Sequence, residues 1–191
     1  MRRISRVLPF ALPLALPFVG APASRAEAQS SQPPQTATMP AAKPEDVQSI
    51  DAILAALYDV ISGPAGQARN WDRFRSLFIP GARLIPTSTA PGGEVRHRVL
   101  SPDEYATQNG AALERNGFFE REISRTTESF GHITQAFSSY ESKRTAQDAK
   151  PFSRGINSIQ LLNDGKRWYV VTIFWDSERP DNPIPTKYLP K

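Results

Sequence analysis

The sequence contains no cysteine and only two histidines among its 191 residues. Without cysteine the chain forms no disulfide bond and offers no thiolate to a metal ion, so the fold must be held together by its core. His97 and His132 lie far apart in the sequence, and their separation matches none of the short spacings of metal-binding motifs. Glycine-rich phosphate loops, paired-carboxylate motifs and nucleophile elbows are also absent from the sequence. We therefore expect no metal ion and no other cofactor.

Long hydrophobic runs are absent as well. The longest apolar stretch, residues 7–19, is interrupted by three prolines and is shorter than the roughly 20 residues that a membrane-spanning helix needs. Arginines at positions 2, 3 and 6 precede this stretch, and Ala26-Glu27-Ala28 follows it as a small-x-small cleavage site. This three-part pattern is typical of a secretory signal peptide. We expect residues 1–28 to direct export to a periplasm or the cell exterior, with no membrane span.

A basic surface for nucleic acid is the next missing feature. The formal net charge is +4. Residues 1–28 hold four arginines and one glutamate, so the chain without them carries about +1. The remaining charges form no basic block that could follow a phosphate backbone, and nucleic acid is therefore not an expected partner.

Composition also divides the chain. Residues 29–43 are rich in proline, glutamine and serine and nearly free of large apolar side chains, so we expect a disordered tether there. Residues 44–191 have the length of one ordinary domain. Four prolines between 176 and 191 predict an extended C-terminal tail on its surface.

Helices are predicted early in this domain. A proline and two acids at 44–46 open an amphipathic helix that Gly63-Pro64 ends, and Asn70 is placed to cap a second short helix. Ser101-Pro102-Asp103-Glu104 has the spacing of a capping box, and it predicts a third helix that ends at Asn116-Gly117.

Strands are predicted between and after these helices. Their expected ranges are 82–87, 94–100, 118–128, 130–144, 152–162 and 167–175. In the second of them Val95, His97 and Val99 alternate with charged residues, so we expect these three to point towards the interior. The last two strands flank an Asn-Asp-Gly turn at 163–165, which predicts a hairpin. Strict alternation in 167–175 places Trp168, Val170, Thr172 and Phe174 on one face, and Tyr169, Val171, Ile173 and Trp175 on the other. Both faces are apolar, so we expect both to be covered.

Helices followed by a mostly antiparallel sheet indicate an α+β domain. Over residues 46–176 the chain resembles the nuclear transport factor 2-like (SnoaL-like) superfamily. The resemblance is carried by the amphipathic first helix, the segment from Trp71 to Phe78 that leads through Pro-Gly into a strand, and the closing Asp-Gly-x-x-Trp hairpin. It implies a strongly bent sheet wrapped around the helices as a cone, a pocket at the wide end, and a homodimer formed through the sheet.

Enzymes of this superfamily, such as ketosteroid isomerases and polyketide cyclases, commonly place a general-base carboxylate near the end of the first strand. The matching stretch here, residues 82–88, contains no carboxylate. The resemblance therefore assigns no catalytic residue to this chain.

Aromatic or polar side chains near the expected cone are candidate pocket residues. Each also has a structural interpretation: core packing for the aromatic residues, a hydrogen bond for a half-buried histidine, or compensation of a helix dipole for the aspartate. The candidates are Tyr58, Trp71, Asp72, Phe78, His97, His132, Trp168 and Trp175.

Three functions remain open at this point. The first is an exported module that binds a small apolar ligand in the cone without catalysis. The second is an isomerase, dehydratase or hydrolase that uses His97, His132 or Asp72 to carry a proton, which requires one of them to face a cavity. The third is a dimeric protein-interaction module whose cone is packed solid. The fold alone does not separate them.

Overall fold

The computed structural model describes residues 39–191. The predicted signal peptide and residues 29–38 of the predicted tether lie outside these residues. In chain order the elements are α1 (Pro44–Val47), α2 (Ile50–Ile61), α3 (Trp71–Ser76), β1 (Phe78–Thr89), β2 (Val95–His97), α4 (Pro102–Asn116), β3 (Phe119–Phe130), β4 (Ile133–Lys143), β5 (Ser153–Asn163), β6 (Trp168–Ser177) and the short 3₁₀ helix η1 (Thr186–Tyr188). In the part of the chain described here, no helix combines the length and apolar character needed to cross a membrane.

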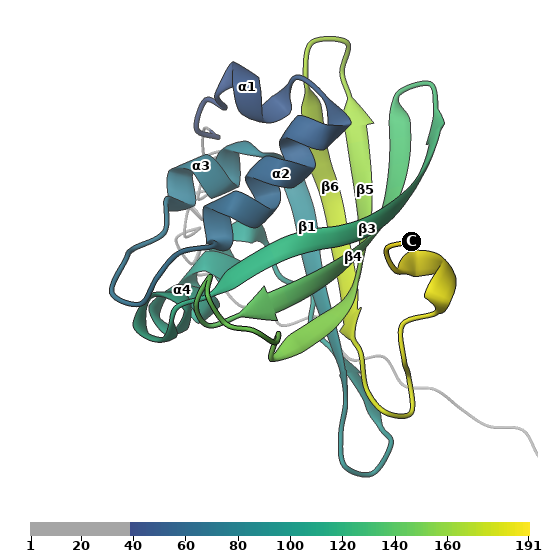
Figure 1. The fold of residues 1–191 in the computed structure, drawn as a ribbon. Coiled ribbons are helices and arrows are strands. Elements are labelled where there is room, and N and C mark those ends of the chain that lie inside the picture. Colours follow the sequence, from purple (N-terminus) through teal and green to yellow (C-terminus); the bar gives the residue numbers. More distant parts are fainter. Residues whose placement is uncertain (1–38) are drawn as a thin grey trace, which may run out of the picture. The chain divides into compact units, whose positions relative to one another are not determined.

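The six strands form one mixed sheet in the order β2-β1-β6-β5-β4-β3. Strands β1 and β6 pair in parallel, and the other neighbouring pairs are antiparallel. The sheet bends around α2, which lies against its inner face together with α3 and α4 (Figure 1). Helices gathered against one face of a bent sheet confirm the predicted α+β cone.

The predicted first helix is two helices. Residues 48 and 49 separate α1 from α2, because Ser49 adopts an extended conformation and its side chain accepts a hydrogen bond from the amide of Ala52. Such an N-cap starts a new helix in the middle of a continuous apolar pattern. The packed domain also begins earlier than predicted, since Met39 and Ala42 at the end of the expected tether lie against the core.

Local signals in the sequence are confirmed at two other places. Ser101 and Glu104 make both hydrogen bonds of the capping box at the start of α4. The turn between β5 and β6 is closed by Asn163, which accepts from the amide of Gly165, and by Asp164, which accepts from the amides of Lys166 and Arg167. Gly165 has a φ of 89°, a conformation that favours glycine.

The predicted face assignment of the last strand is wrong for half of its length. Val170 pairs with Leu161 and Thr172 pairs with Gln160, so Val171 is an extra residue at a bulge. A bulge reverses the alternation of side chains beyond it. Trp168 and Val170 therefore face the core before the bulge, and Ile173 and Trp175 face it afterwards. Phe174 lies on the outer face and is 48% exposed.

The predicted strand 94–100 also differs from the structure. Residues 95–97 pair with the end of β1 in a hairpin that projects beyond the main sheet (Figure 1), and Leu100 forms an isolated bridge with Leu84. Val95 and Val99 are 70% and 54% exposed, so the prediction that they point to the interior is wrong. Alternation marks a buried strand only where a sheet or helix lies against the apolar face, and neither covers this hairpin.

The C-terminal segment lies against the outer face of the sheet. The Ser139 hydroxyl donates to the carbonyl of Tyr188 at 2.7 Å, and the rings of Phe137 and Tyr188 lie 4.9 Å apart. Arg154 pairs with Glu178 at 2.8 Å where the segment leaves β6. The segment therefore covers part of the outer face, opposite to the helices (Figure 1).

Candidate functional site

A cavity of about 220 Å³ lies inside the cone, between the helices and the inner face of the sheet. Its wall is mostly apolar and aromatic, with one carboxyl group and several hydroxyl or amide groups. The residues lining it are Leu57, Tyr58, Ile61, Phe74, Leu84, Tyr105, Phe118, Glu120, Tyr140, Ser142, Phe152, Ser153, Asn157, Ile173, Trp175 and Ser177. An apolar hollow with a few convergent polar groups is the usual form of a small-molecule site.

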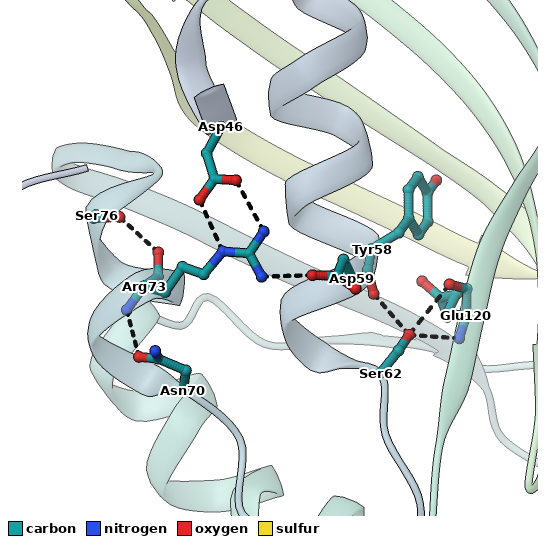
Figure 2. A network of polar contacts seen from close by, with 8 residues as sticks. All are labelled: Asp46, Tyr58, Asp59, Ser62, Asn70, Arg73, Ser76 and Glu120. Carbon is teal, nitrogen blue, oxygen red and sulfur yellow. Dashed lines mark hydrogen bonds and ion pairs between the residues drawn. The ribbon is translucent and has the colours of Figure 1, made fainter. Parts of the chain in front are cut away.

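Glu120, on β3, supplies the carboxyl group, and the end of α2 fixes its backbone. The Ser62 hydroxyl accepts from the Glu120 amide at 3.0 Å and donates to the Tyr58 carbonyl at 2.7 Å, as Figure 2 shows. One residue after Ser62, Gly63 exchanges two backbone hydrogen bonds with Phe118, which lies two residues before Glu120. These contacts hold β3 against the helix and fix the depth at which Glu120 enters the cone.

The environment of the Glu120 side chain favours its protonated form. The Ser142 hydroxyl donates to Glu120 Oε2 at 2.8 Å, but no ion pair of residues 39–191 includes this carboxyl group. Burial among apolar groups raises the pKa of Glu120 from 4.5 to about 7, and hydrogen bonds from Ser142 and Asn157 offset only part of that effect. Glu120 therefore exchanges a proton close to neutral pH.

Tyr58 connects the cavity to a second acid through hydrogen bonds. Its hydroxyl accepts from the Asn157 amide at 3.1 Å and lies 2.7 Å from the Ser138 hydroxyl, which in turn donates to Glu122. Burial raises the pKa of Tyr58 above its ordinary value. Tyr58 therefore stays neutral, and its hydroxyl is held in one orientation by neighbours on two strands.

Four further aromatic side chains shape the wall. The Tyr105 ring stacks on Phe74 at 5.5 Å and meets Trp175 edge-on at 6.4 Å. Tyr140 lies against the backbone of Gly155, where an added Cβ would come within 2.6 Å of the tyrosine hydroxyl and 2.3 Å of the Asp176 carbonyl. Only glycine at position 155 leaves room for this tyrosine.

A wider hollow of about 550 Å³ adjoins the cavity. Tyr58 and Glu120 line both spaces, so these two side chains stand at their junction. The hollow lies between α2 and the start of β3, and its charged residues pair with one another: Arg125 with Asp51, and Arg121 with Glu141. Within the described residues, no three histidine, aspartate or glutamate side chains are gathered closely enough to hold a metal ion.

Comparison with known proteins identifies the architecture. Neither the family models nor the curated proteins contain a match to this chain. Among solved structures, a protein of unknown function with a cystatin-like fold from Nostoc punctiforme aligns with a TM-score of 0.51 and 12% identity, over 72% of this chain and 94% of that one. This chain has a cystatin-like fold.

Two other similar structures are nuclear transport factor 2-like proteins of unknown function. The one from Methylobacillus flagellatus has a TM-score of 0.44 and 11% identity, covering 69% of this chain and 95% of that one. The one from Shewanella baltica has a TM-score of 0.41 and 12% identity, covering 69% and 98%.

The cystatin-like fold places two of the eight candidate residues, Tyr58 and Trp175, in the cavity wall. Three others pack in or against the core outside that wall: Trp71, Phe78 and Trp168. The remaining three are exposed: Asp72, His97 and His132. Asp72 pairs with Arg75 in the first turn of α3, and His132 lies in the turn between β3 and β4, where its carbonyl accepts from Asn163.

Glu120 is the functional candidate that the sequence reasoning missed, together with Tyr105, Tyr140 and Asn157. The signal for Glu120 was weak: it is an acid directly after two phenylalanines at the start of a strand. A carboxyl group next to strongly apolar neighbours is a candidate for burial. The sequence could not say which face of β3 would turn inwards.

Proposed function

We propose that this chain is an exported module that binds a small, mostly apolar molecule in the cavity of its cone. The observation that supports this most directly is the cavity itself, about 220 Å³ with an aromatic wall and a single carboxyl group. A cone whose aromatic residues filled its interior would have had no room for a ligand. Tyr58, Glu120 and Asn157 supply the few polar groups that would orient a bound molecule.

Export is proposed from the pattern of residues 1–28. Its charged start, short apolar run and small-x-small site together are typical of a cleaved signal. Sequencing the N-terminus of the protein recovered from its host checks this, with a new N-terminus near Gln29 as the expected result.

A homodimer through the sheet remains a prediction. The exposed Phe174 on the outer face supports it, but the C-terminal segment already covers part of that face through Tyr188 and Ser139. A partner would therefore have to pack beside this segment. The third hypothesis, a solid cone used only for protein interaction, is weakened by the cavity.

An enzyme that uses Asp72, His97 or His132 as its proton carrier is not supported, because all three side chains are exposed and none lines the cavity. Glu120 favours a different version of that hypothesis. A carboxyl group with a pKa of about 7 inside an apolar cavity is suited to proton transfer next to a carbonyl group. Proton-transfer catalysis by Glu120 is therefore the second candidate function.

Exchange of the α-hydrogens of cyclohexanone for deuterium, followed by NMR, tests this second candidate. We expect the protein to accelerate the exchange by at least about 100-fold over buffer, the lower range for a positioned base, and the Glu120→Gln variant to lose the acceleration. Equal rates for the two proteins would exclude Glu120 as the base.

Filling the cavity should abolish ligand binding. Ser153 lines the cavity from β5, whereas Ser158 lies on the opposite face of the same strand, beside Phe174 and Tyr188. We expect native mass spectrometry of the protein purified from its exporting host to detect a bound small molecule. The Ser153→Phe variant should lose this molecule, because a phenyl group takes up the space.

The Ser158→Phe variant is the matched control, and it should keep the molecule. Loss of the molecule from both variants, or from neither, would contradict binding in the cavity.

A further inference from the structure

We propose that the ligand of this cavity is a small organic cation, an ammonium group with apolar substituents, whose charge pairs with Glu120. This inference rests on the proposed function and adds the chemical class of the ligand. It follows from three properties of the cavity: its charge, its aromatic wall and the engagement of the nearby cations by other groups.

The first property is an acid without a cation. Elsewhere in the described chain, weakly exposed acids have arginine partners: Asp46 accepts two hydrogen bonds from Arg73 (Figure 2), and Glu141 pairs with Arg121. No lysine, arginine or histidine lines the cavity. A carboxylate withdrawn from solvent is costly unless a cation compensates it, and no cation of the cavity wall does so.

The second property is the aromatic wall. Seven aromatic side chains surround the space beside Glu120: Tyr58, Phe74, Tyr105, Phe118, Tyr140, Phe152 and Trp175. Aromatic faces attract alkylammonium groups through the ring quadrupole, and they also accommodate the apolar substituents of such a cation. A free carboxylate of a ligand would instead be repelled by Glu120.

The third property is the position of the protein's own positively charged side chains. The titratable side chains that lie close to Glu120 are Tyr58 from α2, Tyr105 from α4 and Tyr140 from β4, and none of these is a cation. Three cations line the adjoining hollow, Arg121, Arg125 and Lys143, and each of these lies within 4 Å of an acid, Glu141 for two of them and Glu122 for the third. A fourth cation, Arg144, lies over the ring of Phe152 at 4.2 Å.

A matched pair of probes tests the inference. Phenyltrimethylammonium is a permanent cation, and tert-butylbenzene has the same shape without the charge. Binding of each to the purified protein is measured by ligand-observed NMR at pH 8.5 and pH 5.5. At pH 8.5 we expect the cation to bind at least about 10-fold more tightly than its neutral counterpart, which is the gain of about 1.4 kcal/mol that one partly desolvated charge contact provides.

The pH dependence has a definite sign. A cation binds the ionised form of Glu120, so its affinity should fall as acid protonates that carboxylate. With a pKa of about 7, the affinity at pH 5.5 should lose most of the contribution of the charge contact and be at least about 8-fold lower than at pH 8.5. A neutral ligand that accepts a hydrogen bond from protonated Glu120 would show the opposite trend.

Two variants complete the test. Glu120→Gln should remove both the preference for the cation and its pH dependence. Glu128→Gln changes the charge by the same amount at an exposed position of the same strand, and it should leave both unchanged.

The outcomes separate the two proposals. Equal binding of the two probes, or tighter cation binding at pH 5.5, would overturn the cation inference while the cavity remained a binding site. If neither probe binds at either pH, both the inference and the proposed function are wrong.

Discussion

Replacing Glu120 by glutamine should raise the free energy of unfolding by up to about 3 kcal/mol at pH 8.5 and change it little at pH 4. The pKa of this carboxyl group is raised from 4.5 to about 7 in the folded chain, chiefly by burial. Each pKa unit corresponds to about 1.36 kcal/mol, so ionised Glu120 opposes folding by that total. Glutamine is never ionised and still accepts the hydrogen bond from Ser142.

The sign follows from the raised pKa of the folded state. Because the folded chain holds the proton more tightly, the stabilising effect of protonation is complete below pH 4.5 and is lost as the pH rises through 7. The wild-type protein should therefore lose stability between those values, and the Glu120→Gln variant should lose less.

Urea unfolding at several pH values, followed by circular dichroism, measures this. The Glu128→Gln variant, with its side chain already exposed, should behave like the wild type. A Glu120→Gln variant that is less stable than the wild type at pH 8.5 would show that the carboxylate is compensated in the folded chain.

The parts of the fold that the sequence predicted well depend on neighbours along the chain. The capping box at Ser101, the Asn70 cap and the turn at Asn163 each act within three or four residues. Their chemistry is complete in the local sequence, so their positions could be read directly.

The parts that were missed depend on contacts between distant residues. The bulge at Val171 exists because of how β6 aligns with β5, and it reversed the orientation of the residues after it. No composition or spacing in 167–175 marks that position. The exposed hairpin at β2 was missed for a similar reason, since its alternating pattern does not reveal whether another element covers it.

In the candidate site too, some residues could be predicted from the local sequence and others depend on contacts with distant residues. Tyr58 and Trp175 were predicted, because a large amphipathic helix and a strongly apolar strand almost always face a core. Glu120 was missed, because its inward orientation is set by Ser62 and Gly63, far away in the sequence. The sequence instead favoured histidines and an aspartate for their chemistry, and the structure leaves all three in solvent.

Arg69, a buried arginine in the loop after α2, gives the second large expected effect on stability. Arg69 is only 7% exposed, and its guanidinium group donates to the carbonyls of Ile61, Gly63, Gln67 and Leu113. It therefore joins the end of α2, the loop after it and the last turn of α4. Gly63 lies close beside it: an added Cβ would come within 2.7 Å of Arg69 Nη1, so the guanidinium group would have to shift.

Replacing Arg69 by methionine should lower the free energy of unfolding by about 3–5 kcal/mol, because several buried carbonyls lose their only charged donor. Arg69→Lys should recover only part of this loss, since an ammonium group cannot span the four carbonyls as the planar guanidinium does. Urea unfolding gives both values.

Arg75→Met is the comparison for the loss of an arginine on the surface. Arg75 pairs with Asp72 and Asp103, which are 81% and 66% exposed, so its replacement should cost about 1 kcal/mol or less. Equal losses at the two positions would contradict the role assigned to Arg69.

The Arg69→Met variant should also bind ligand more weakly than Arg75→Met. The carbonyl of Gly63 accepts from both Arg69 and the amide of Phe118, and a shift of that residue moves the start of β3 and Glu120 with it.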